Sequence, residues 1–138
     1  MWQHAYSADA GLAPEAIWTQ YASTGTWPTW NAGMVKLDLE GPFETGSTGR
    51  VASEGQPPAS STLSDVTEGE GFTIDVQLTD ELTSRSDCRV TALPGGGSRI
   101  THTVEFTGPG SEQMGAAHGE VLAGNIAAGV EALVEAAR

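Results

Sequence analysis

Residues 98–108 read SRITHTVEFTG, and apolar and polar side chains alternate along nearly the whole segment. A period of two is typical of a β-strand with one buried and one solvated face. One histidine stands in the apolar row, which consists of Ile100, His102, Val104 and Phe106. Each apolar neighbour contributes about 1.5–3 kcal/mol when buried. We therefore expect His102 to face the interior, either as a core histidine or as a group that points into a cavity.

The same alternation extends backwards along the chain from this strand. Residues 71–78, GFTIDVQL, place four apolar side chains on one face, and residues 94–97, PGGG, supply a tight turn. Glycine-rich turns separate alternating segments from residue 34 to residue 107, and residues 2–8 alternate as well. Because most connections are short, we expect an antiparallel sheet with one solvated and one covered face.

Three segments have helical rather than strand spacing. Residues 12–24 place Pro14 near a helix start, and a tight helical turn carrying two tryptophans follows. We expect a long alanine-rich helix over about residues 111–137 to cover the sheet. Four glycines in this helix indicate close approach to the sheet, open space beneath it, or a compositional bias. Its expected inner stripe consists of Met114, His118, Val121, Leu122, Asn125, Gly129 and Leu133.

The length and the net charge of the chain argue against several classes of function. The chain has 138 residues, which suits one domain over residues 1–138. Eighteen acidic residues against six basic ones give a formal net charge of −12, so we exclude nucleic acid as a partner. No apolar run approaches the roughly 20 residues that span a bilayer, so we expect no membrane insertion. The polar outer faces of the strands favour a monomer or a weak homodimer.

The residue types and their spacing argue against several kinds of site. Cys88 is the only cysteine, so the sequence offers neither an intramolecular disulfide nor a cysteine zinc site. Three histidines without a carboxylate at ligand spacing predict no metal, and we expect no cofactor. The segment MWQHAYSADAG (1–11) lacks the features of a signal peptide, so we expect a cytoplasmic protein.

Two longer segments resemble a known superfamily. LAPEAIWTQYASTGTWPTWNAGMVKLDLEGPFETGSTG (12–49) and GGGSRITHTVEFTGP (95–109) are similar to the START-like, polyketide cyclase/dehydrase superfamily, often called SRPBCC. The segment SEGQPPASS (53–61) is more polar than the usual strand there. The resemblance implies an α+β helix-grip fold. In that fold a curved antiparallel sheet of about seven strands wraps a long C-terminal helix, two short helices follow the first strand, and a cavity lies between sheet and helix.

The resemblance implies three functions, and fold alone does not choose among them. The first is binding of a hydrophobic or aromatic small molecule, lipid-like or polyketide-like, in the cavity. The second is a polyketide cyclase or dehydratase that uses acid–base catalysis there, and the third is a regulatory or co-chaperone-type module. Cyclases of the superfamily often place an arginine in the pocket, and the candidates here are Arg50, Arg85, Arg89 and Arg99, of which Arg99 alternates outward.

The candidate site residues follow from these patterns. His102 is the candidate base, with Tyr6 or His118 as the proton donor, because histidine titrates near physiological pH. We expect Trp30 at the mouth of the cavity, although its indole also suits plain packing. The predicted ligand-binding residues are Trp30, Ile74, Val76, Cys88, Val90, Val104, Met114, His118, Leu122 and Asn125.

Overall fold

A computed structural model describes residues 1–31 and 34–138. Residues 32 and 33, which come shortly after the predicted tight helical turn with two tryptophans, lie outside the described residues. The elements are β1 (Trp2–Ala10), α1 (Pro14–Ala22), the 3₁₀ turn η1 (Thr24–Thr26), α2 (Trp27–Trp30), β2 (Met34–Leu39), β3 (Thr48–Ser53), β4 (Ala59–Thr67), β5 (Gly71–Thr79), β6 (Leu82–Ala92), β7 (Ser98–Thr107) and α3 (Ser111–Ala137).

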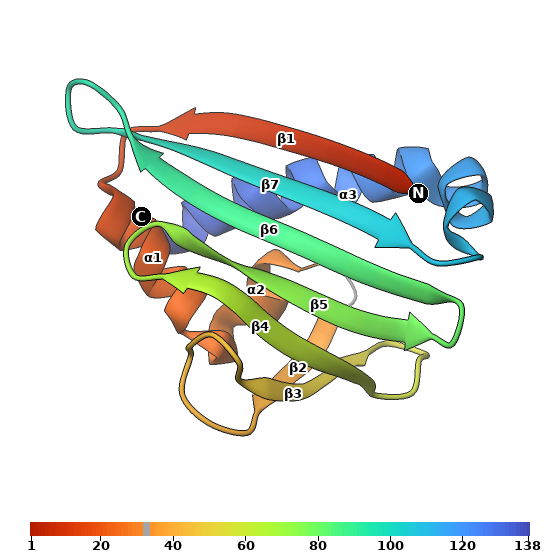
Figure 1. Ribbon diagram of the computed structural model, residues 1–138. Coiled ribbons are helices and arrows are strands. Elements are labelled where there is room, and N and C mark those ends of the chain that lie inside the picture. The colour runs from red at the N-terminus through yellow and green to blue at the C-terminus, as the bar shows by residue number, and fades with distance from the viewer. Residues whose placement is uncertain (32–33) are drawn as a thin grey trace.

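The described strands form one antiparallel sheet in the order β1-β7-β6-β5-β4-β3-β2. All three helices lie on one face of it, and α3 runs along its length (Figure 1). The predicted α+β helix-grip fold, with about seven strands and two short helices after the first strand, is confirmed. Among the residues that the structure describes, no helix combines the length and apolar character that a membrane crossing needs.

Strand register aligns the inward-facing side chains in rows across the sheet. Tyr6 on β1 lies opposite His102 on β7, and His102 lies opposite Cys88 on β6. Cys88 in turn lies opposite Phe72 on β5, so one row crosses four strands. Side chains that are far apart in the sequence therefore meet under the helices.

The short helix α1 delivers an aromatic side chain to this row. Pro14 stands at its start and Glu15 in its first turn, which suits the positive end of the helix dipole. Ile17 and Tyr21, four residues apart, both have no exposed surface. The Tyr21 ring meets the Phe72 ring edge-on at 5.1 Å between centroids.

The tight helical turn α2 completes the aromatic cluster. The Trp27 ring stacks on Phe72 at 5.1 Å, and its indole N–H donates to the Tyr21 carbonyl oxygen at 2.9 Å. The Trp30 ring lies 5.8 Å from both the Tyr21 and the His102 rings. Both tryptophans are buried, so α2 is held against the sheet by the burial of two indoles.

The long helix α3 packs mainly on β1 and β7 and against α1 and α2. Of the predicted stripe, Gly129 and Leu133 lie on the inner face, whereas His118 and Val121 are exposed. The helix contacts the Trp2 indole through Gly115 and Gly119 instead. The prediction favoured larger side chains in this part of the helix, whereas the contact with Trp2 requires small ones.

Close approach explains three of the four helix glycines. A Cβ at Gly115 would collide with the indole of Trp2, and one at Gly119 would lie only 3.0 Å from the indole nitrogen. A Cβ at Gly129 would lie 2.8 Å from the Trp30 carbonyl oxygen. Gly124 has no neighbour within 4 Å of such an atom. The glycines therefore let α3 approach β1 and α2 closely.

These glycines give a paired stability prediction. Gly124→Ala adds a good helix former in open space and should stabilise the protein by up to about 1 kcal/mol. Gly129→Ala gains the same propensity but presses on the α2 backbone, so a net loss of about 1–2 kcal/mol is expected. Urea unfolding followed by circular dichroism measures both. Equal stabilisation by the two variants would contradict a tight α2–α3 contact.

Candidate functional site

A pocket of about 150 Å³ lies between the sheet, α2 and α3, and we call it the His102 pocket. The sheet supplies its floor from the row that contains His102 and from the adjacent row. The helices supply the walls, where Gly129 lets α3 come close to Trp30. Its lining residues are Trp30, Asn31, Ser86, Cys88, His102, Val104, Asn125, Ile126 and Gly129.

Two further hollows continue the His102 pocket along β5 and β6. The second, of about 170 Å³, shares Ser86 and Cys88 with the His102 pocket. The third, of about 300 Å³, shares Val76 and Leu78 with the second and reaches Leu82. We call the three together the groove. Between Leu82 and Cys88, β6 is about 20 Å long at the usual rise per residue.

His102 is joined to the helices by one hydrogen bond. Its Nε2 lies 2.8 Å from the Tyr21 hydroxyl oxygen, and His102 is only 6 % exposed. Burial lowers the pKa of His102 to about 4, although the Asp87 carboxylate opposes the shift. Burial also raises the pKa of Tyr21 well above its usual value. Both groups are therefore neutral at physiological pH.

The other polar groups of the His102 pocket are neutral as well. Burial, reinforced by the Asp87 carboxylate, raises the pKa of the Cys88 thiol, so Cys88 is a protonated, weakly reactive thiol. The Trp30 indole N–H is buried and has no hydrogen-bond partner among the described residues. Ser86 and Asn31 add a hydroxyl and an amide.

Most side chains that the sequence assigns to the cavity do line the groove. Their positions come from the alternation of the strands, which the register brings to one face. Trp30, Cys88, Val104 and Asn125 line the His102 pocket, Ile74 and Val76 line the second hollow, and Met114 lines the third.

Four of the predicted site residues do not line the groove. His118 is exposed, because α3 contacts Trp2 through Gly115 and Gly119, and it does not line the groove. Tyr6 neighbours His102 across the β1–β7 pair but is only half-buried, and Tyr21 rather than Tyr6 bonds the imidazole. Val90 is buried in the core and Leu122 is half-buried, and neither lines the groove.

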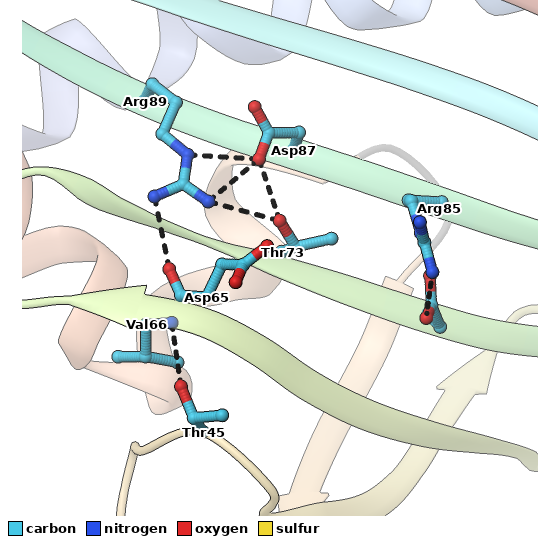
Figure 2. Close-up of polar contacts among 8 residues, drawn as sticks. Thr45, Asp65, Val66, Thr73, Arg85, Asp87 and Arg89 are labelled. Carbon is cyan, nitrogen blue, oxygen red and sulfur yellow. Dashed lines mark hydrogen bonds and ion pairs between the residues drawn. The ribbon is translucent and has the colours of Figure 1, made fainter.

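No arginine among the described residues lines the groove. Arg89 lies on the opposite face of the sheet, where its guanidinium contacts Asp87 at 2.9 Å and the Asp65 carbonyl oxygen at 3.1 Å (Figure 2). Arg85 pairs with an aspartate on the adjacent strand in the same view. Arg99 pairs with Asp9 at 2.8 Å, and Arg50 is exposed, so the pocket arginine that the resemblance implies is not found here.

Tyr21, Ser84 and Ser86 are among the polar side chains at the site that the sequence analysis did not assign to it. The role of Tyr21 could not be predicted from the sequence, because its contact with His102 joins residues 81 apart. Ser84 and Ser86 share the inner face of β6 with Cys88, which the alternation alone predicts. Within residues 1–31 and 34–138, no cluster of His, Cys, Asp and Glu side chains is placed to hold a metal ion.

The lowered pKa of His102 gives a pH prediction. The unfolded chain takes up this proton near pH 6.5, whereas the folded protein resists it down to about pH 4. The stability that a neutral His102 contributes is thus present above about pH 6.5 and lost as pH falls, by about 3 kcal/mol in full. His102→Gln should flatten the fall in unfolding free energy between pH 6.5 and 5, measured by urea titration. His118→Gln, at an exposed imidazole, is the control, and an unchanged slope in His102→Gln would contradict the assignment.

Known structures share this architecture at low sequence identity. A hypothetical protein from Helicobacter pylori superposes with a TM-score of 0.82 at 9% identity, covering 99% of this chain and 88% of its own. The Zhui aromatase/cyclase from a Streptomyces species has a TM-score of 0.76 at 12% identity, covering 99% and 93%. Truncated norcoclaurine synthase from Thalictrum flavum has a TM-score of 0.73 at 14% identity, covering 97% and 91%. At these identities the likeness shows the fold alone.

Sequence comparison identifies the family to which the chain belongs. None of the curated protein sequences matches this chain. A family described as "Polyketide cyclase / dehydrase and lipid transport" matches residues 1–138, the full length given. The fold, the groove between sheet and helix, and the two motif segments agree with that match. The chain belongs to the polyketide cyclase/dehydrase and lipid transport family, within the START-like superfamily.

Proposed function

We propose that this protein binds a neutral, largely apolar small molecule, aromatic or lipid-like, in the groove. The observation that carries the proposal is the chemistry of the lining. Every described side chain that lines the three hollows is apolar or neutral, and none is an aspartate, glutamate, lysine or arginine. Burying an unpaired charge there would be costly, whereas burying apolar surface is favourable.

The size of the groove sets the size of the ligand. Ligand sites usually enclose about 300–1,000 Å³, so the His102 pocket of about 150 Å³ is too small on its own. A ligand therefore extends from this pocket into the second hollow, whose lining includes Trp27, Phe72, Ile74 and Val76. Aromatic walls of this kind favour a flat or extended hydrocarbon body.

The family supports either ligand binding or a cyclase role, and the state of His102 favours binding. General acid–base catalysis works best when the pKa of the catalytic group lies near the operating pH. An imidazole with a pKa of about 4 is a weak base at neutral pH, and its Nε2 is already engaged by Tyr21. A docking module is less well supported, because Val35, Leu78 and Val121, large apolar side chains exposed among the described residues, lie on separate elements.

A matched pair of variants tests the binding site. Ser86→Phe places a bulky ring between the first two hollows, whereas Thr91→Phe places the same ring on the exposed outer face of the same strand. With the neutral fluorescent probe N-phenyl-1-naphthylamine, Ser86→Phe should weaken binding at least about tenfold, or roughly 1.4 kcal/mol. Thr91→Phe should bind like the wild type. Absence of binding by the wild type, or equal binding by both variants, would count against the proposal.

A further inference from the structure

The Tyr21 hydroxyl has one hydrogen-bond partner among the described residues. Tyr21 has no exposed surface, and the only described partner of its hydroxyl is the Nε2 atom of His102 at 2.8 Å. If Nε2 carried the proton and donated it, the phenolic hydrogen would be left without an acceptor in a dry interior. Leaving a buried donor unsatisfied is strongly disfavoured. Tyr21 therefore donates and Nε2 accepts.

This direction sets the tautomer of His102. A neutral imidazole carries one proton, so a bare Nε2 places that proton on Nδ1. His102 lines the pocket, and its Nδ1 has no hydrogen-bond partner among the described residues. The buried atoms without a partner in the described chain are Trp30 Nε1 and Ser61 Oγ, so Nδ1 is not sealed off by protein. His102 thus offers an N–H donor to the pocket.

A second ring donor lies beside the first. The Trp30 indole N–H also has no acceptor among the described residues, and its ring lies 5.8 Å from the imidazole. Asn31, Ser86 and Asn125 line the same pocket, and none of them accepts from either ring. Trp30 Nε1, however, is enclosed by protein, so His102 Nδ1–H is the ring donor that faces the pocket.

We propose that the ligand carries a neutral carbonyl oxygen, as in an aryl ketone or a quinone, and that this oxygen accepts a hydrogen bond from His102 Nδ1–H. Tyr21 is the positioning residue that holds His102 in this tautomer. The inference rests on the proposed binding function and names the ligand class for the same site. A carboxylate is excluded by the uncharged lining of the groove, which offers no cation to compensate it.

Two probes of the same shape test this ligand class. 2-Acetylnaphthalene and 2-ethylnaphthalene differ in one carbonyl oxygen, and calorimetric titration of the intact protein gives both affinities. The ketone should bind about tenfold more tightly than the hydrocarbon, which is the usual net value of one hydrogen bond. Equal affinities would overturn the carbonyl proposal and leave apolar binding in place. Failure of both probes would overturn the binding function itself.

Tyr21→Phe separates the positioning role from packing. The variant keeps the ring but frees the imidazole to move its proton to Nε2, so the preference for the ketone should fall below about threefold while the hydrocarbon still binds. Tyr6→Phe is the control, because the Tyr6 hydroxyl makes no hydrogen bond in the described structure. A tenfold preference that survives in Tyr21→Phe would overturn the role of Tyr21.

The tautomer can also be observed directly without a ligand. Long-range proton–nitrogen correlation spectra distinguish a protonated ring nitrogen from a bare one. In the wild type and in Tyr6→Phe, His102 should show a protonated Nδ1 and a bare Nε2, and this pattern should be lost in Tyr21→Phe. A proton on Nε2 in the wild type would overturn the proposal whatever the probes do.

Discussion

The hydrogen bond between Tyr21 and His102 connects helix α1 to the middle of the sheet. Tyr21 comes from the helix that follows the first strand, and His102 comes from the middle of the last strand. The bond satisfies two polar groups that are otherwise buried in aromatic and aliphatic surroundings, where an unpaired polar atom is costly. Burial keeps both groups neutral, and the uncharged character of the His102 pocket follows from that neutrality.

The position of α3 explains why a groove remains at all. Glycines let the helix lie directly on Trp2 at one edge of the sheet and on the Trp30 carbonyl at α2. The helix therefore contacts β1 and β7 closely and leaves the inner faces of β5 and β6 only partly covered. A helix with larger inner side chains would stand further from β1, and the space beside it would have a different shape. The glycine positions are thus part of the site although they touch no ligand.

The fold could be predicted from the sequence, whereas the site could be predicted only in part. Alternation places His102, Cys88 and Ile74 on the inner face, and the structure agrees because burial enforces a period of two. Alternation does not say which residue lies opposite which, so the meeting of Tyr21 with His102 could not be read from the pattern. The predicted stripe of α3 was wrong at His118 and Val121, because the size of a side chain is a poor guide where the partner, Trp2, is itself large.

The surface ion pairs have an effect at long range. Five of the six basic side chains, all except Arg50, already pair with a carboxylate or lie within 4.0 Å of one. The remaining acidic groups therefore set the sign of the field around the molecule, which a net charge of −12 makes strongly negative. Fatty-acid anions and phosphate esters are slowed on approach, the more so in dilute salt. The field of the protein thus disfavours anions relative to uncharged molecules before either reaches its surface.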